Sequence, residues 1–154
     1  MDGDALLQSL TAFDASVRQR DKTNRPAVEV AGDRLLALLT HLRRAPELAF
    51  DMLLDHTAVD LPEPGRIECF YTLYSTVHGH LLMVCTSVPR DRAVVPTVSA
   101  LWPTAHWQER EVFDLMGVQY DDHSDLRRLF LEDDWQGHPL RKDYQDADML
   151  ELAK

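Results

Sequence analysis

Apolar residues recur at helical spacing in three segments of this chain. The first covers residues 4–20, where one stripe of a helix would carry Leu6, Leu10, Phe13 and Val17. The second covers residues 33–44, with an apolar side made of Leu35, Leu38, Leu39 and Leu42. The third begins after Thr104, a typical N-cap, and runs to Met116, because Gly117 is a common helix stop. We therefore expect three helices, of which the first is amphipathic.

Alternating and continuous apolar runs predict strands between these helices. Short strands are expected around residues 28–30 and 48–58, and residues 66–77 and 80–88 should form a hairpin. In the second hairpin strand the residues that point to either face are apolar. This strand should therefore lie centrally in the sheet, covered on both faces. The first hairpin strand has one clearer inward set, which is Ile67, Cys69, Tyr71 and Leu73.

The order of these elements predicts an α+β fold, a mixed sheet with helices packed on it. A short helical segment is also expected over residues 95–101. No sustained period follows from 117 to 144, and loops longer than about 12 to 15 residues usually serve a function or stay disordered. We expect one domain over residues 1–154, with a core at about 27–116 and an irregular C-terminal docking segment at 117–154.

Charge and hydropathy narrow the possible partners. The 154 residues carry a formal net charge of -10, and such a field repels nucleic-acid phosphates, so nucleic-acid binding is not expected. No apolar run is longer than five residues, the length of Leu81 to Cys85, whereas a membrane-spanning helix needs about 20. The N-terminal residues lack the features of a signal peptide. We expect a soluble chain of cytoplasmic type that contacts a membrane only through a complex.

Common catalytic arrangements find no support in the spacing of the residues. Glu109 and Glu111 could be a pair of acids, but each helical residue turns by about 100°, so the two point to opposite sides. The chain has no G-x-S-x-G nucleophile motif and no glycine-rich phosphate loop. The sequence therefore predicts no catalytic residue.

The cysteines and histidines also lack the spacing of metal ligands. Cys69 and Cys85 are the only cysteines, so protein thiolates alone cannot hold an iron–sulfur cluster or a structural zinc ion. His123 and His138 lie in predicted loops beside several aspartates. A stand-alone metal-dependent enzyme that uses them stays open as a rival, although we expect neither metal nor cofactor in this chain.

The third helix carries acids inside its apolar arcs. Glu109 and Glu111 each interrupt such an arc, and Arg110 lies four residues before Asp114 on the remaining side. A helix that is apolar on most sides is usually enclosed on most sides, so another chain is expected to supply part of the cover. Buried carboxylates need partners, and the nearest cations in the sequence are Arg127, Arg128, Arg141 and Lys142.

The segment after this helix has the composition of an interface. It interleaves cations with apolar and aromatic residues, Leu126, Leu129, Phe130, Leu131, Trp135, Leu140 and Tyr144, and Trp, Tyr and Arg are enriched where interfaces carry most energy. We expect it to fold over a larger neighbouring subunit; the alternative is that it wraps its own domain. The predicted structural and interface residues are Glu109, Arg110, Glu111, Asp114, His123, Arg127, Arg128, Trp135, His138, Arg141, Lys142 and Asp143.

These residues resemble the signature of a known family, the 30 kDa (C-type) subunit of respiratory complex I. The matching positions are Glu109-Arg110-Glu111, Asp114-Leu115-Met116, His123 and Arg127, followed by the whole block from Trp135 to Asp143. Weaker similarity in length and pattern reaches back to about Ala27. Met116, Asp122, Ser124 and Phe130 depart from the usual pattern.

The resemblance implies a cofactor-free subunit of the peripheral arm of a proton-pumping NADH:quinone oxidoreductase. Such a subunit packs against the large, D-type subunit of the quinone site and lies near the iron–sulfur subunits, and the partner subunits carry FMN and the iron–sulfur clusters. The resemblance also implies a peripheral position on the cytoplasmic side of the membrane. Close relatives serve in membrane-bound hydrogenase-type complexes, so an equivalent subunit of such a complex is the alternative.

Overall fold

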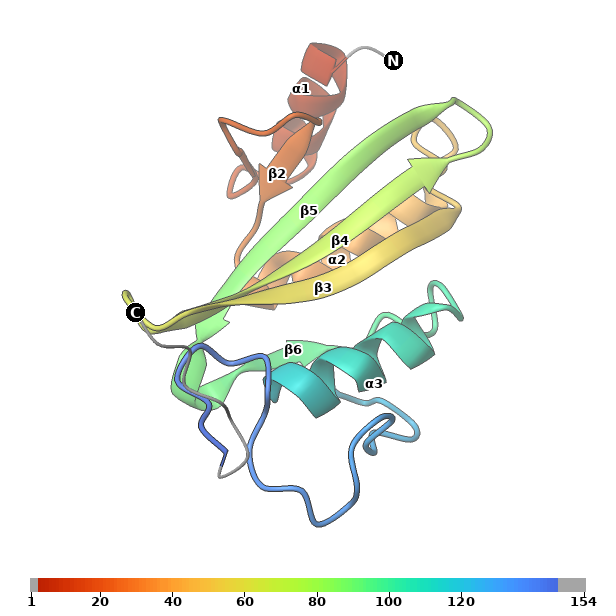
Figure 1. The fold of residues 1–154 in the computed structure, drawn as a ribbon. Coiled ribbons are helices and arrows are strands. Elements are labelled where there is room, and N and C mark those ends of the chain that lie inside the picture. Colours follow the sequence, from red (N-terminus) through yellow and green to blue (C-terminus); the bar gives the residue numbers. More distant parts are fainter. Residues whose placement is uncertain (1–2, 147–154) are drawn as a thin grey trace.

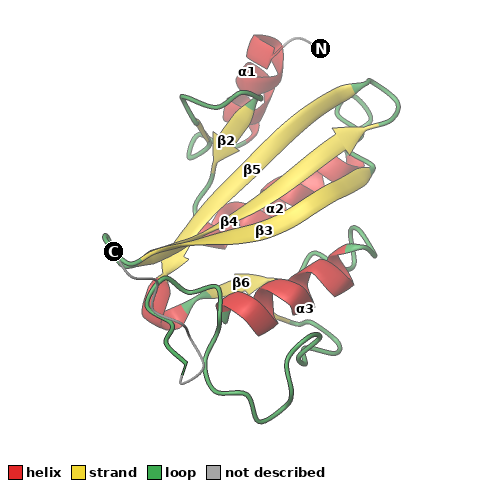
Figure 2. Ribbon diagram, viewed as in Figure 1, coloured by secondary structure: helices red, strands yellow, loops and turns green. Residues whose placement is uncertain are grey.

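The structure, a computed structural model, describes residues 3–146; the end of the expected docking segment, 147–154, lies outside this range. The helices and strands of the described residues lie between residues 3 and 121 (Figures 1 and 2). In chain order the elements are α1 (Gly3–Phe13), β1 (Arg18–Gln19), β2 (Ala27–Glu29), α2 (Gly32–Arg44), β3 (Met52–Leu61), β4 (Arg66–Ser75), β5 (His80–Pro89), the 3-10 helix η1 (Arg90–Arg92), β6 (Val94–Pro96), α3 (Ala105–Met116) and β7 (Gln119–Asp121).

The strands form a mixed sheet of five, in the order β1-β2-β5-β4-β3. The three long strands β3, β4 and β5 pair antiparallel, whereas β2 joins β5 in parallel. A second, two-stranded sheet pairs β6 with β7 in parallel. In Figure 1, α2 lies behind the three long strands and α3 lies beneath β3. The α+β class and the mixed sheet expected from the sequence are confirmed.

The core lies on the sheet face that the hairpin pattern predicted. Ile67, Cys69, Tyr71 and Leu73 of β4 are all fully buried, and the register places them opposite Val88, Thr86, Val84 and Leu82 of β5. The apolar stripe of α2 is buried against this face. As expected, β5 has a neighbour on each side, but Leu81 and Met83 on its second face are only half-buried. The second face is therefore covered less than the apolar pattern suggested.

Helix α1 ends at Phe13, seven residues before the predicted end, so that prediction was wrong. The Asp14 carboxylate accepts hydrogen bonds from the backbone N–H and the hydroxyl of Ser16, at 2.9 and 2.7 Å, and from Arg34 Nε at 2.7 Å. A side chain that bonds its own following backbone competes with helix continuation. Val17 is buried all the same, just before the edge strand β1.

Two further predictions of local structure were wrong. Residues 95–101, predicted as helix, contain the end of β6 followed by turns, and Gln119–Asp121 form β7 inside the stretch predicted to be irregular. These two short strands stabilise each other by parallel pairing across more than 20 residues, a non-local contact that periodicity does not reveal. His56 of β3 fixes β7 to the main sheet, because its Nε2 lies 2.6 Å from the Tyr120 hydroxyl.

The remaining boundaries differ in detail. Strand β3 covers Met52–Leu61 rather than residues 48–58. Helix α3 has the predicted end at Gly117, whose φ is 73°, but Thr104 makes no side-chain capping hydrogen bond.

Among residues 3–146, none of the helices has the length and apolar character needed to cross a membrane.

Candidate interface site

Asp114 anchors the segment that follows α3. The side chain is fully buried, and its Oδ2 accepts three backbone N–H groups, from Leu129, Phe130 and Leu131, at 3.0, 2.7 and 3.0 Å. Arg128 Nη1 donates to Oδ1 at 2.8 Å. Burial tends to raise the pKa of Asp114, but these four donors together lower it below its ordinary value. The carboxylate is therefore charged, and it holds one turn of the chain by its backbone.

Two arginines bind backbone carbonyls of the same segment. Arg110, only 5% exposed, donates to the carbonyls of Arg127 and Arg128 at 3.1 and 3.2 Å, with its guanidinium 5.0 Å from the Trp107 ring centre. Arg128 also donates to the carbonyls of Trp135 and Gly137 at 2.9 and 3.3 Å. Arg110 lies four residues before Asp114 but forms no ion pair with it: within the described range, Arg128, one of the expected cations, supplies the ion pair of Asp114.

His138 and Arg141 close the C-terminal end of α3. His138 Nδ1 lies 3.0 Å from the Asp114 carbonyl, and Arg141 Nε donates to the Met116 carbonyl at 2.8 Å. A cation at this end interacts favourably with the helix dipole. Gly117 makes the approach possible, since a Cβ there would lie 2.5 Å from His138 Cδ2 and 2.9 Å from Arg141 Nη2. Burial is the main cause that lowers the pKa of His138, which favours the neutral ring.

Glu109 lies on the opposite side of α3 from Glu111, as the helical geometry predicted. It is fully buried, and it accepts a hydrogen bond from Thr97 Oγ1 at 2.5 Å and from the Val98 N–H at 2.7 Å. Burial raises the pKa of Glu109, and the two neutral donors lower it by a smaller amount than burial raises it. The resulting pKa is about 7. The cations expected as partners do not reach this carboxylate; within the described residues the nearest ionisable partner is His123, with Nε2 3.9 Å from Oε2.

His123 is packed between α3 and the turn after β7. Its ring stacks on His106 with centroids 4.7 Å apart, Nε2 lies 3.2 Å from the His106 carbonyl, and Nδ1 accepts the Asp125 N–H at 3.1 Å. These contacts place the proton on Nε2 of the neutral ring. Burial lowers the pKa of His123, so it offers little charge to Glu109.

A second anchor, which the sequence did not reveal, joins the segment to β3. Asp60 is buried in β3 and accepts two hydrogen bonds from Arg90, at 2.6 and 2.9 Å, and one from the Lys142 N–H at 2.8 Å. Arg90 also pairs with Asp143 at 2.5 Å. The one local signal for this site was the charged residue Asp60 between the apolar residues Val59 and Leu61. Its partners Arg90 and Lys142 lie 30 and 82 residues away.

Other predicted residues remain at the surface. Glu111 is exposed, Arg127 is exposed and pairs with Asp125 at 3.0 Å, and the Lys142 side chain is also exposed. Trp135 is 37% exposed, and Phe130, which was not among the predicted site residues, is 64% exposed. Of the twelve predicted residues, Asp114, Arg110, Arg128, His138 and Arg141 converge on the C-terminal half of α3. Within the described residues, no group of three or more His, Cys, Asp and Glu side chains is placed to hold a metal ion.

Solved structures with the same fold indicate the class of protein. A chain of the membrane-bound sulfane sulfur reductase, an archaeal respiratory membrane complex, matches with a TM-score of 0.80 and 26% identity over 99% of this chain and 96% of that one. A trypsin-resistant fragment of Nqo5 matches with a TM-score of 0.69 and 27% identity over 80% of this chain and 98% of the fragment. The fold and the self-contained charged site thus define a small subunit of the respiratory-complex type.

Sequence comparison then places the chain within that class. Residues 28–149 match the family described as respiratory-chain NADH dehydrogenase, 30 kDa subunit. The C-type subunit of NADH-quinone oxidoreductase from Moorella thermoacetica is 43% identical over 92% of this chain and 95% of that protein, and its Geobacter sulfurreducens counterpart is 40% identical over 91% and 87%. The chain belongs to this family and is the C-type, 30 kDa subunit of NADH-quinone oxidoreductase, complex I. Of the interpretations left open by the sequence, the comparisons favour complex I.

Proposed function

We propose that this chain is a cofactor-free structural subunit of the peripheral arm of complex I. In this proposal the segment from 117 to 154 docks on the large, D-type subunit of the quinone site, with the iron–sulfur subunits nearby. The chain supports electron transfer from NADH to quinone without performing it. It lies on the cytoplasmic side of the membrane and contacts the membrane only through the complex.

The observation that carries the docking proposal is the fixed presentation of Phe130. Its backbone N–H is held by the buried Asp114 carboxylate at 2.7 Å, yet 64% of the residue is exposed. Leu140, 56% exposed, and Trp135 belong to the same segment. An apolar side chain on a loop that is rigidly held in advance costs little entropy on binding, as interface anchors require.

A fused relative supports the choice of partner. A Pseudomonas fluorescens protein, named as a fusion of the C-type and D-type subunits of NADH-quinone oxidoreductase, is 35% identical over 92% of this chain, which spans 26% of that protein. Subunits joined in one chain act at high effective concentration, so fusion is favourable where the two parts bind each other. We infer that the D-type subunit is the partner of the docking segment.

The chemistry of the potential ligands supports a role without a cofactor. Burial raises the pKa of the Cys69 and Cys85 thiols to about 12, which disfavours the thiolate form that ligates metals. The charged groups of the site already have partners: Asp114, Arg110, Arg128 and Arg141 all bind groups of their own chain. We therefore assign them the structural task of holding the docking segment, and we assign no residue a catalytic role.

Replacing exposed anchors in the intact complex tests the docking proposal. Phe130→Ala combined with Trp135→Ala should lower the amount of the D-type partner that co-purifies with this chain by about tenfold or more, because two anchors of this size are together worth at least about 1.4 kcal/mol. Arg141 is a less suitable probe, since its guanidinium also holds the Met116 carbonyl and its loss would disturb folding.

The matched control is Val77→Ala in the β4–β5 turn, where the valine is 70% exposed. This variant should co-purify like the unaltered chain. Unchanged recovery of the D-type partner with the Phe130 and Trp135 double variant, provided that its circular dichroism is native, would contradict the proposal.

A further inference from the structure

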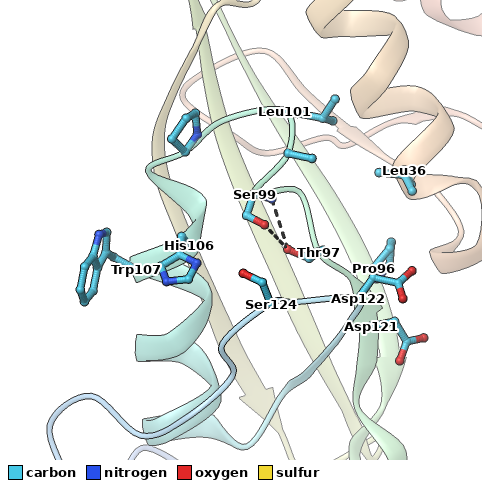
Figure 3. A pocket seen from close by; sticks show the side chains of 12 residues that line it. Leu36, Pro96, Thr97, Ser99, Leu101, His106, Trp107, Asp121, Asp122 and Ser124 are labelled. Carbon is cyan, nitrogen blue, oxygen red and sulfur yellow. Dashed lines mark hydrogen bonds between the residues drawn. The ribbon is translucent and has the colours of Figure 1, made fainter.

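A groove runs between α2, α3 and the loop that follows β6. Figure 3 shows Leu36 and Leu101 along one side, His106 and Trp107 of α3 on the other, and Asp121 and Asp122 towards one end. Its volume is about 720 Å³. The groove is distinct from the surface around Phe130, which is not among its lining residues.

The apolar side chains at this groove are exposed where their helices should be polar. Leu36 is 42% exposed and lies off the buried stripe of α2, which consists of Leu35, Leu38, Leu39 and Leu42. Trp107 is 58% exposed at the outer rim. Single exposed apolar residues are ordinary, but two of them from separate helices at one groove mark an interaction surface.

The loop after β6, which lines the groove, is held in place by a buried side chain of α3. The buried Glu109 carboxylate accepts the Thr97 hydroxyl at 2.5 Å and the Val98 N–H at 2.7 Å. Ser99 in turn shares a hydrogen bond of 2.9 Å with Thr97. Because this loop is tied to α3 by a buried group, the shape of the groove persists without an occupant.

Two carboxylates at the end of the groove have no partner within the described residues. Asp121 and Asp122 are exposed, and among residues 3–146 no hydrogen bond or ion pair engages their side chains. Asp122 has a φ of 64°, a conformation in which Asp and Asn are enriched and which turns the chain sharply at this point. Arg92 lies beyond Asp121 in the adjoining hollow of about 560 Å³, without forming an ion pair with it.

We propose that this groove receives an extended segment of another subunit of the complex, one that places an aliphatic side chain beside Leu36 and a Lys or Arg beside Asp122. Charge complementarity argues for a basic occupant, because two adjacent carboxylates attract a cation. A second copy of this chain fits poorly, since two chains of formal net charge -10 repel each other. The inference rests on membership of the complex and not on the docking of the Phe130 surface.

Photochemical cross-linking in the assembled complex tests the proposal. Leu36 is replaced with the photoreactive p-benzoylphenylalanine, the complex is isolated and irradiated, and the joined peptides are identified by mass spectrometry. The expected product joins position 36 to one stretch of another subunit that contains a Lys or Arg. Asp122→Asn should lower its yield about threefold, as expected for loss of one partly exposed ion pair, and added salt should lower the yield in the unaltered background more than in the variant.

The same photoreactive residue at Val77 is the control, because this position is exposed at the far hairpin turn. It should not label the stretch that position 36 labels. A yield at position 36 no higher than at 77, a product with a second copy of this chain or with its own residues 147–154, or a product that responds to neither Asp122→Asn nor salt would overturn the proposal. If the Phe130 and Trp135 double variant co-purified normally, so that the docking proposal failed, the cross-link at position 36 would still be measurable in the complex.

Discussion

Glu109 and Asp114 are two fully buried carboxylates on the same helix, and they differ in the donors around them. Asp114 has an arginine and three backbone N–H groups, whereas Glu109 has one hydroxyl and one N–H. The pKa of Asp114 is accordingly lowered, and burial raises that of Glu109 to about 7. Burial alone therefore does not decide the charge of a carboxylate; the number and charge of its donors do.

The two groups also hold different parts of the molecule. Asp114 ties the chain at residues 128–131 to α3 and so shapes the proposed docking surface. Glu109 ties the loop at 97–98 to α3 and so shapes the groove. One helix thus organises two surfaces, the first with a charged anchor and the second with an anchor whose pKa of about 7 leaves it partly protonated near neutral pH.

The largest expected effect is that of Asp114→Ala. It leaves Arg128, whose side chain is only 15% exposed, without its carboxylate and three amides without an acceptor. Removal of one member of a buried ion pair typically costs about 3 to 5 kcal/mol, so we expect the free energy of unfolding to fall by about 4 kcal/mol. Urea denaturation measures this, and hydrogen exchange should show lost protection at residues 129–131.

Asp114→Asn is the matched control, because the amide oxygen keeps an acceptor for the backbone N–H groups but lacks the charge that Arg128 requires. Its cost should be smaller than that of Asp114→Ala. Equal costs for the two variants would show that the ion pair, and not the three N–H acceptor bonds, carries the stability of this anchor.

Glu109→Gln should change how stability depends on pH. With a pKa of about 7 in the folded state against 4.5 as the ordinary value, Glu109 binds a proton more tightly when folded. Its contribution is therefore most favourable below about pH 4.5 and is lost as the pH rises to about 7. Each pKa unit corresponds to about 1.4 kcal/mol, so the variant should gain about 3 kcal/mol relative to the unaltered chain across this window.

Urea denaturation of both chains at about pH 4.5, 6 and 8 checks this prediction, and their difference removes the titration of other groups. Glutamine can still accept the Val98 N–H and donate to the Thr97 hydroxyl, so the fold should persist. A difference that does not grow with pH would mean that Glu109 is ionised throughout, with His123 as the nearest candidate for its partner.

Gly117→Ala tests how closely the docking segment approaches α3. The added Cβ would meet the His138 ring at 2.5 Å, and φ is 73°. We expect a loss of about 2 kcal/mol, of which about 1 is the backbone cost alone. Gly79→Ala supplies that reference, because its φ is 66° and nothing lies within 4 Å of its added Cβ. Equal losses measured by thermal unfolding would mean that His138 moves aside without cost.

The sequence predicted those parts of the fold that depend on local pattern. The end of α3 at Gly117 and the inward set of β4 agree with the structure, because helix stops and strand alternation are local signals. The pairing of β6 with β7 was missed, since each strand has three residues and is stabilised by the other. The early end of α1 involves Asp14, which bonds Ser16 locally and also Arg34, 20 residues away.

In the candidate site too, local geometry was predictable from the sequence and contacts between distant residues were not. Helical geometry correctly separated Glu109 from Glu111, because a turn of about 100° per residue needs no tertiary information. The partner of Asp114 was not predictable, as Arg110 at helical spacing and Arg128 in the loop are equally plausible from sequence, and the loop conformation decides between them. Asp60 and Arg90 pair across 30 residues that contain both strands of the β4–β5 hairpin.

Glu111→Lys should have the smallest effect on the isolated chain and completes the comparison of the acids on α3. Glu111 is exposed and has no ion pair within residues 3–146, so the free energy of unfolding should change by no more than about 0.5 kcal/mol. If a partner covers this side of α3, as the apolar arcs around it suggest, the reversed charge should reduce co-purification of the complex. Glu47→Lys, at an exposed acid after α2 and outside the proposed docking segment, is the control for charge alone. Equal recovery of the complex with both variants would remove Glu111 from the proposed interface.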